Sequence, residues 1–353
     1  MRYVLAAAAV TVAFGLGWSS STASAGLKGR LTTHSSCTAV TQSGAGLQQF
    51  VDRLRPGDVG CLAQGDYAVR RLILKQPGSG ASPITLMSLD SRRPATIHGV
   101  VWLSDSADYW IVAGLRFDGR NPWNLPSPIV NGDHSIWRSD DFSNRGSGDG
   151  TQPYGGSICF SLGQLDHYGY ATDTTIERNR IHDCGISNNE NHGIYAVATS
   201  GRTIIRNNWI FRNGDRGIQL YPDAQDVLIT HNVIDSNGSG VIFSGHNQLT
   251  SRNILVARNI ISNSVKRWNV ESWYPAGTPV GTRNMVRENC LWAQSPEPFY
   301  DRDGGISPRI GFVLGRGNVI QRPTFTAAGR GNYSLVRHSG CRGFGPVASP
   351  PTW

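Results

Sequence analysis

An alternation of apolar and polar residues that ends in an asparagine returns five times along the middle of the chain. The copies span residues 175–181, 204–210, 228–234, 255–261 and, less regularly, 285–291. Such alternation is typical of a strand with one buried face. The asparagines of the copies follow one another at separations of 29, 24, 27 and 30 residues. A period of this size indicates a solenoid, in which each repeat packs on its neighbours.

Each repeat continues from its asparagine into a second short strand, a glycine-rich bend and a third strand. The third strands cover residues 193–196, 217–221 and 240–244. Three strands and three corners predict a triangular coil of parallel strands, and therefore an all-β solenoid. An asparagine at a sharp corner tolerates left-handed backbone, and its amide can bond the backbone or the equivalent amide of the next coil. We therefore expect the row of asparagines to be structural.

The N-terminal residues predict a secreted protein. Arg2, an apolar run over residues 3–17 and a small-x-small end at residues 23–25 form the pattern of a signal peptide, residues 1–25. The apolar run is short for a membrane span, so we expect no membrane association after cleavage.

The remaining chain is expected to form one domain and to be a monomer. Residues 26–72 are assigned to an N-terminal cap and the first coil, with an amphipathic helix at residues 47–54. Parallel coils are expected over residues 73–344, followed by a proline-rich tail at residues 345–353. Residues 146–156 interrupt the repeat with glycine, aspartate and proline, which predicts a long surface loop.

The six cysteines are even in number, as expected for disulfides in an exported chain. Six cysteines allow fifteen connectivities. Pairing of nearest neighbours is the simplest hypothesis, and Cys37–Cys61 is the pair that it favours most. The sequence contains no C-x-x-C, so it predicts neither a zinc ribbon nor a thiol redox motif.

The charge of the chain favours an anionic partner. Lysine and arginine number 33 against 25 acidic residues, which gives a formal net charge of +8. A basic secreted protein suits acidic glycans, envelope polymers or nucleic acid, although such a charge can also serve solubility alone. No nucleic-acid recognition motif accompanies the charge, and the chain lacks a phosphate-binding loop, a G-x-S-x-G and an H-E-x-x-H sequence. Nucleic acid is therefore not the expected partner.

Three acidic residues near the predicted surface loop raise the alternative of a calcium site. Asp140, Asp141 and Asp149 offer the oxygen ligands that calcium prefers. Their spacing is not that of a regular calcium-binding loop. We therefore expect no metal ion and no cofactor.

The opening coils resemble those of known polysaccharide-cleaving proteins. Residues 54–58, 65–67 and 83–86 resemble the first coils of chondroitinase B and of the β-helical alginate lyases. On this ground the chain is similar to the pectate-lyase-like superfamily. The resemblance covers most of the chain after the signal peptide. It implies a right-handed single-stranded parallel β-helix with an N-terminal cap, and a polysaccharide that lies in a groove along one face. It assigns no catalytic residue.

Alignment of the third strands on their leading glycines predicts which side chains share the outer surface. Ile194, Ile218 and Val241 then point inward, and Ile242 lies outward in one row with Tyr195 and Gln219. The outward group contains His192, Tyr195, Asp215, Arg216, Gln219 and Tyr221, and the next coil adds Lys266, Arg267, Glu271 and Trp273.

This outward group suits β-elimination from an acidic polysaccharide. Removal of the C5 proton of a uronate needs a base, an acid for the leaving oxygen and donors that neutralise the carboxylate. The catalytic candidates are His192, Tyr195, Asp215 and Arg216. His192 or Tyr195 would be the acid or the base, and Arg216 would pair with the carboxylate. The substrate-binding candidates are Gln219, Tyr221, Trp273 and Lys266, with the aromatic rings as platforms for sugars.

Other interpretations of these residues stay open. His192 would alternatively cap backbone groups at a tight corner, and Asp215 with Arg216 would form a surface ion pair. A C5-epimerase would use the same groups as a lyase. A glycoside hydrolase would draw two carboxylates from Asp215, Asp223 and Glu271. A glycan-binding solenoid without activity would need only the exposed aromatic residues.

Overall fold

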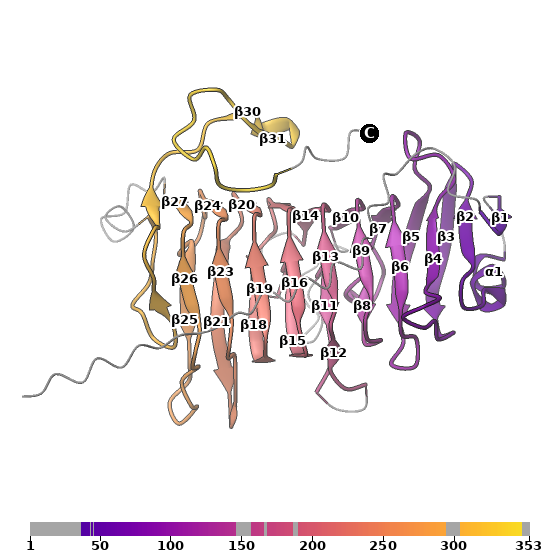
Figure 1. The fold of residues 1–353 in the computed structure, drawn as a ribbon, viewed down its shortest axis with the longest axis horizontal. Helices are drawn as coiled ribbons and strands as arrows, with labels where there is room; N and C mark the ends of the chain where they lie inside the picture. The colour runs from indigo at the N-terminus through magenta and orange to yellow at the C-terminus, as the bar shows by residue number, and fades with distance from the viewer. Residues whose placement is uncertain are drawn as a thin grey trace, which may run out of the picture. The chain divides into compact units, whose positions relative to one another are not determined.

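The computed structural model describes residues 37–42, 44, 46–145, 157–165, 168–185, 190–293 and 304–347. In these ranges the chain winds through successive coils of short parallel strands that stack along one axis (Figure 1). The predicted signal peptide, residues 1–25, and the predicted surface loop, residues 146–156, lie outside the described residues. Among the helices in the described ranges, none has the length and apolarity that a bilayer span requires.

The first face of the solenoid is an eleven-stranded parallel sheet, most of which faces the viewer in Figure 1. In order across the sheet, its strands are β1 (Ala39–Thr41), β2 (Val59–Leu62), β4 (Ile84–Ser88), β6 (Trp110–Ala113), β9 (Ile136–Arg138), β13 (Thr175–Glu177), β16 (Thr203–Arg206), β19 (Val227–Thr230), β23 (Leu255–Ala257), β26 (Met285–Arg287) and β28 (Val313–Leu314). The five predicted repeats supply five adjacent strands of this sheet, from β13 to β26, which confirms the period read from the sequence.

Two further faces diverge from the long strands β3 (Asp66–Leu74) and β5 (Thr96–Leu103). The second face contains β7 (Arg116–Asp118), β10 (Asp141–Asn144), β14 (Arg180–Cys184), β17 (Trp209–Phe211), β20 (Val233–Asp235), β24 (Ile260–Ser262), β27 (Cys290–Trp292) and β29 (Val319–Ile320). The third face contains β8 (Ile129–Val130), β11 (Phe160–Leu162), β15 (Ile194–Ser200), β18 (Arg216–Ala224), β21 (Ser239–His246) and β25 (Val270–Trp273). The short strands β12 (Ala171–Thr172) and β22 (Leu249–Thr250) pair with β15 and β21.

The core consists of apolar rows that run from coil to coil. On the first face the buried row in register is Ile176, Ile205, Ile229, Val256 and Val286. On the third face it is Ile194, Ile218, Val241 and Val270, which confirms the predicted inward positions. Each coil covers the apolar surface of the previous one, so the hydrophobic stabilisation accumulates along the stack.

A row of polar side chains lines the corner between the first and second faces. Its members are Asp140, Asn179, Asn208, Asn232, Asn259, Asn289 and Asn318. Oδ1 of Asn232 accepts from the backbone N–H of Asn208 at 2.9 Å, and its Nδ2 donates to the carbonyl of Ile205 at 2.9 Å. The structural role is confirmed. The left-handed residue is the preceding one, such as His231 (φ 55°), since Asn232 already leads into β20.

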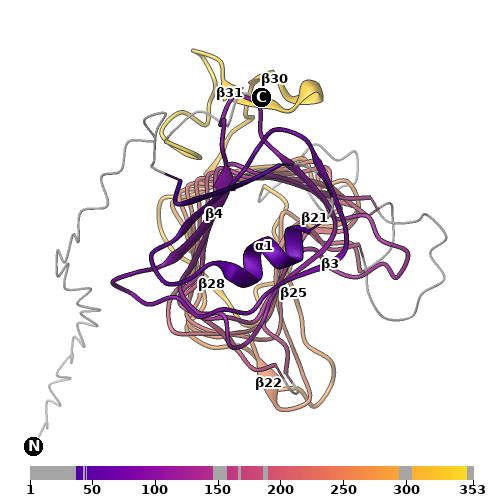
Figure 2. The same ribbon diagram turned by 90° about the vertical axis from the view of Figure 1, so that its right-hand side faces the viewer.

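The helix predicted near residue 47 is present as α1 (Leu47–Arg53), and it lies across the opening of the N-terminal coil (Figure 2). Its apolar residues Leu47, Phe50 and Val51 are buried in the core. Gln48 exchanges two hydrogen bonds of 2.8 Å with the backbone of Ile73 in β3. The side chain thereby satisfies backbone groups that an unpaired strand would leave exposed.

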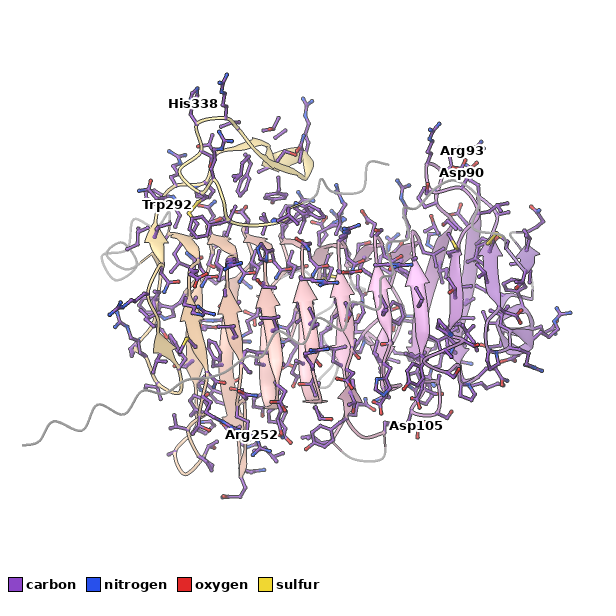
Figure 3. The ribbon with its side chains drawn as sticks, in the orientation of Figure 1. Asp90, Arg93, Asp105, Arg252, Trp292 and His338 are labelled. Atoms are coloured by element: carbon purple, nitrogen blue, oxygen red, sulfur yellow. A yellow bond between two sulfur atoms is a disulfide. The ribbon has the colours of Figure 1, made fainter. Side chains whose placement is uncertain are left out.

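Residues 321–347 form a C-terminal strap that turns back over the second face (Figures 1 and 3). The strap contains β30 (Phe325–Ala327), a short 3-10 helix (Ala328–Arg330) and β31 (Asn332–Leu335). Its Tyr333 packs against Trp209 and Phe211 of β17 in a buried apolar cluster. The backbone N–H of Gly345 donates to the carbonyl of Arg258 at 2.9 Å. Side chains of the strap and the coil therefore pack as one apolar layer.

Three disulfides join neighbouring cysteines in the chain. They are Cys37–Cys61, Cys159–Cys184 and Cys290–Cys341. The predicted nearest-neighbour pairing is confirmed. The Cys290–Cys341 bond attaches the strap to β27. The Cys159–Cys184 bond links the residue before β11 to the last residue of β14.

Candidate functional site

The third face carries one outward row of side chains that crosses its strands in register. The members of this outward row are Trp102, Ile129, Ser161, Tyr195, Gln219, Ile242 and Glu271. The predicted alignment of Tyr195, Gln219 and Ile242 is confirmed. Neighbouring strands lie about 4.8 Å apart, so residues that are distant in sequence become close neighbours on this surface.

Asp215 is the centre of an ion-pair cluster at the start of this face, called here the Asp215 cluster. Its carboxylate is fully buried, and both Arg216 and Arg267 donate to it. Oε1 of Glu271 lies 3.5 Å from Nε of Arg216 and 3.3 Å from Nε of Arg267. The hydroxyl of Ser239 donates to the same Glu271 oxygen at 2.9 Å. Two acidic and two basic groups thus compensate one another, as buried charges require.

The two arginines lie between the buried acids and the surface. Burial lowers the pKa of Arg216 despite the attraction of Asp215, and Arg267 adds repulsion in the same direction. Burial also acts to lower the pKa of Arg267, but Glu271 and Asp215 outweigh it and raise that pKa. The side chain of Arg216 is 13% exposed and that of Arg267 is 30% exposed. The cluster therefore presents two oriented guanidinium groups to the third face.

His192 lies in the interior beside the Asp215 cluster. It is 1% exposed, and its Nδ1 is 3.6 Å from Oδ2 of Asp215. Burial lowers the pKa of His192 well below its ordinary value, and Arg216 and Arg267 shift it further in the same direction. The imidazole is therefore neutral at neutral pH. The structure thus brings His192 to the predicted group, with its ring and that of Tyr195 in a T-shaped contact at a centroid distance of 5.4 Å, and shields it from solvent.

Aromatic side chains extend the surface next to the cluster. Ring centroids of Tyr195 and Tyr221 are 6.4 Å apart, and those of Tyr221 and Trp273 are 6.1 Å apart. The Tyr221 hydroxyl and Nδ1 of His246 are hydrogen-bonded at 3.0 Å. Burial raises the pKa of both Tyr195 and Tyr221, so both phenols are protonated at neutral pH. Trp273 is 53% exposed and offers a flat apolar surface to a sugar ring.

The other two predicted residues lie at the edges of this group. Gln219 follows Tyr195 in the outward row and interacts with the ring of His192. Lys266 is exposed, and its Nζ donates to the carbonyl of Gly214 at 2.6 Å. All eight predicted site residues therefore belong to one region of the third face.

Two further residues belong to this region: Ser239, which the strand alignment places level with Arg216 but to which sequence reasoning gave no role, and Glu190, which it missed. Ser239 pairs in register with Arg216, as the alignment predicts, and its contact with Glu271 is what the sequence does not show. The negative charge of Glu190 contributes to the raised pKa of Tyr195 and of Tyr221. Glu190 precedes the repeat-like strand at a corner, where the sequence gives no signal for the direction of a side chain.

The carboxylates that a hydrolase would use are engaged elsewhere. Asp215 and Glu271 contact the same two arginines within the cluster. Asp223 is buried, accepts from Nε2 of Gln225 at 2.7 Å and also accepts from the hydroxyl of Tyr170. The three acids therefore do not form two accessible carboxylates on opposite sides of a glycosidic bond.

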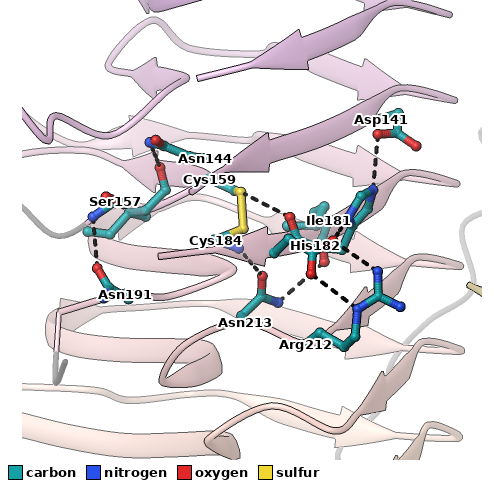
Figure 4. The surroundings of a disulfide bond; sticks show 12 residues. Asp141, Asn144, Ser157, Cys159, Ile181, His182, Cys184, Asn191, Arg212 and Asn213 are labelled. Carbon is teal, nitrogen blue, oxygen red and sulfur yellow. Dashed lines mark hydrogen bonds and ion pairs between the residues drawn. A yellow bond between two sulfur atoms is a disulfide. The ribbon is translucent and has the colours of Figure 1, made fainter. Parts of the chain in front are cut away.

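The acidic residues considered for calcium have protein partners. Asp140 is fully buried at the head of the asparagine row, its Oδ1 accepts from the N–H of Leu115 at 2.9 Å, and burial raises its pKa well above the ordinary value. Asp141 pairs with His182, which points toward it beside the Cys159–Cys184 disulfide in Figure 4. Asp149 lies outside the described residues. In the part of the chain that the structure describes, no three metal-binding side chains gather.

Comparisons with known proteins agree with this architecture. A family model described as a right-handed beta helix region matches residues 155–287. Pectate lyase Pel9A has a TM-score of 0.52 at 12% identity, over 90% of each chain. An alginate lyase from Paenibacillus sp. str. FPU-7 has a TM-score of 0.49 at 16% identity, over 71% of this chain and 94% of that one. PfbA, a surface adhesin of Streptococcus pneumoniae, has a TM-score of 0.46 at 12% identity, over 77% and 78%.

No curated protein matches the chain in sequence. The family match covers the central coils, and the superposition on pectate lyase Pel9A extends over the stack as a whole. The chain therefore has a right-handed parallel β-helix fold, which it shares with pectate lyase Pel9A, as the resemblance in its opening coils implied.

Proposed function

We propose that this protein is a secreted lyase that cleaves an acidic, uronate-containing polysaccharide by β-elimination. The observation that carries the proposal is the pair Arg216 and Arg267, which Asp215 fixes at the third face beside a group of aromatic rings. Three disulfides and the signal-peptide pattern support secretion. The net positive charge favours an anionic polymer.

Substrate binding in this proposal uses two kinds of contact. Arg216 and Arg267 donate to the uronate carboxylate, and the sugar rings lie against Tyr221 and Trp273. Neutralisation of the carboxylate makes the neighbouring C5 proton more acidic, because negative charge develops there in the transition state. Asp215 acts as a positioning residue, since it holds both guanidinium groups and is itself buried.

The elimination needs one proton acceptor and one proton donor. The Tyr221 oxygen takes the C5 proton as its own hydroxyl proton passes to His246, which is exposed and hydrogen-bonded to it. The electron pair of the C–H bond forms the C4–C5 double bond, the C4–O bond breaks, and Tyr195 gives its proton to the leaving oxygen. The raised pKa of Tyr195 suits a donor that is protonated before the reaction. His192 is a neutral positioning residue against Tyr195. A C5-epimerase would use the same groups and return a proton to C5 from the opposite face.

The test is activity on pectate, alginate, glucuronan and glycosaminoglycans, with unsaturated-uronate absorbance and reducing ends followed together. We expect both signals from the natural protein. Tyr195→Phe should lower kcat by about 10²-fold or more, the usual loss for a positioned acid. Tyr109→Phe, which removes a hydroxyl in the turn between β5 and β6, several coils before the Asp215 cluster, should leave the rate unchanged. Reducing ends without absorbance would indicate a hydrolase, and silence on both signals would overturn the lyase proposal.

Burial of two predicted catalytic residues favours a second candidate, glycan binding without catalysis. His192 and Asp215 are both shielded from solvent, whereas Trp273 is largely exposed. A binding solenoid would retain the polysaccharide in affinity electrophoresis and release no product. In that case Tyr195→Phe would not alter retention, and Trp273→Ala would weaken it.

A further inference from the structure

A second group of aromatic and basic side chains lies on the N-terminal part of the third face, away from the Asp215 cluster. Trp102 belongs to the outward row, and its Nε1–H donates to Oδ1 of the buried Asn131 at 2.8 Å. Tyr168 meets the indole edge-on, with ring centroids 5.1 Å apart. The orientation of the Trp102 ring is therefore fixed before any ligand arrives.

Two arginines extend this aromatic surface. The guanidinium of Arg70 lies 4.9 Å from the ring centroid of Trp123, and that of Arg71 lies 5.9 Å from the ring of Trp102. Trp123 is 38% exposed, and both arginines are exposed in β3. Among the described residues, no carboxylate forms an ion pair with Arg70 or Arg71. Their charge thus differs from that of the Asp215 cluster, where buried acids compensate each arginine.

The outward row joins the two groups through Trp102 and Tyr195. Register leads from Trp102 through Ile129 and Ser161 to Tyr195. Three steps of about 4.8 Å separate the two ends by about 14 Å. An extended polymer that lies along the row can therefore contact both groups at once, and a shorter ligand cannot.

We propose that Arg70, Arg71, Trp102 and Trp123 form a distal binding subsite for an acidic polysaccharide. The indoles offer flat faces to sugar rings, and the guanidinium groups offer paired donors to uronate carboxylates. The polymer class rests on the proposed function, but the subsite needs no catalytic step. Simultaneous contact at both groups makes the second binding event intramolecular, so long chains bind more tightly than short ones.

The test measures Kd for intact polygalacturonate and alginate in the Tyr195→Phe background, in which the polymer is not cleaved. Arg70→Ala/Arg71→Ala and, separately, Trp123→Ala should weaken binding of the polymer by about tenfold. Arg316→Ala/Arg322→Ala removes the same charge from exposed arginines outside the third face and should change Kd less than twofold. Thermal unfolding checks that each variant is folded.

Several results would overturn the subsite. One is polymer binding that is unchanged in the Arg70/Arg71 and Trp123 variants, and another is an equal loss in the Arg316/Arg322 control. The subsite would also be contradicted if the protein without the Arg70, Arg71 and Trp123 substitutions bound single-stranded DNA or an uncharged polysaccharide as tightly as the acidic polymers. The absence of any polymer binding would contradict it as well. A protein that binds in the expected way but releases no product would retain the subsite and lose the lyase proposal. Cleavage of the polymer by the natural protein, together with unchanged binding in the variants, would retain the lyase proposal and overturn the subsite.

Discussion

Arg267 donates a hydrogen bond to the carboxylate of Asp215, which lies 52 residues earlier in the chain. Arg267 lies in the turn before β25, and Asp215 directly precedes β18. Because β21 lies between these two strands on the third face, the ion pair spans the coil that contains β21. A donor held in this way loses little freedom when a ligand carboxylate arrives. The arrangement therefore holds the guanidinium groups of Arg216 and Arg267 in place at the third face.

Removal of the central charge should destabilise the cluster. Asp215→Asn keeps the shape of the side chain but removes one of the two carboxylates that Arg216 and Arg267 share, and leaves Glu271 with both arginines. We expect the free energy of unfolding to fall by about 3 kcal/mol, the typical cost of an uncompensated buried charge. Denaturant titration measures the change. Asp90→Asn, on an exposed loop, is the control and should leave the midpoint in place. Equal stability of Asp215→Asn would show that the carboxylate does not hold the arginines.

The asparagine row should be sensitive at its centre. Asn232→Ala removes the acceptor for the backbone N–H of Asn208 and the donors to Ile205 and Asn259. Each unsatisfied buried group costs about 1–3 kcal/mol, so the loss should be at least about 3 kcal/mol. Asn253→Ala, at an exposed corner, should cost much less, and urea unfolding of both variants compares them. Similar losses at the two sites would contradict the structural role of the row.

His182 should make stability depend on pH. Burial alone would lower its pKa, but hydrogen bonds to Asp141 (Nε2–Oδ1 3.1 Å) and Asp183 (Nδ1–Oδ2 2.7 Å) outweigh burial and raise it. For Asp141 and Asp183 burial acts to raise the pKa, and contacts that include His182 outweigh it and lower both values. The ion pairs of His182 with the two aspartates therefore stabilise the folded state fully between about pH 4 and pH 6.5, which are the unfolded pKa values of aspartate and histidine.

This stabilisation is lost at both ends of the pH range, because a different group changes its charge at each end. As pH rises through the folded pKa of His182 the imidazolium is lost, and as pH falls through the folded pKa values of Asp141 and Asp183 the carboxylates are lost. The Tm difference between the natural protein and His182→Gln should therefore be largest near pH 5–6 and shrink toward pH 8. A difference that stays constant from pH 5 to 8 would contradict the ion pairs.

The disulfide of the C-terminal strap should control its release. Cys290 and Cys341 are 51 residues apart, and closing a loop of that size stabilises the folded state by about 4 kcal/mol in the chain-entropy treatment. In Cys290→Ser/Cys341→Ser, limited proteolysis should cut the strap before the coils. Loss of the Cys37–Cys61 bond should not expose the strap. Cleavage within the coils before the strap would show that the apolar layer alone holds residues 321–347.

The sequence predicted those features that repeat once in every coil. The row through Asn179 and Asn232 and the outward position of Tyr195 follow from a fixed register, so one aligned strand places the others. The strap has no such repeat, and its docking through Tyr333 depends on contacts between distant segments. The partners of Asp215 were only partly predictable, because Arg267 lies in an irregular turn whose geometry no local pattern sets.

Mass spectrometry of the products from a uronate polymer tests the central claim most directly. Elimination creates a new chain end with a double bond, so one product is lighter by one water molecule than the corresponding product of hydrolysis. We predict this lighter, ultraviolet-absorbing product from the natural protein and its strong reduction in Tyr195→Phe. Products that contain the added water, or an intact polymer that the protein binds, would contradict cleavage by β-elimination.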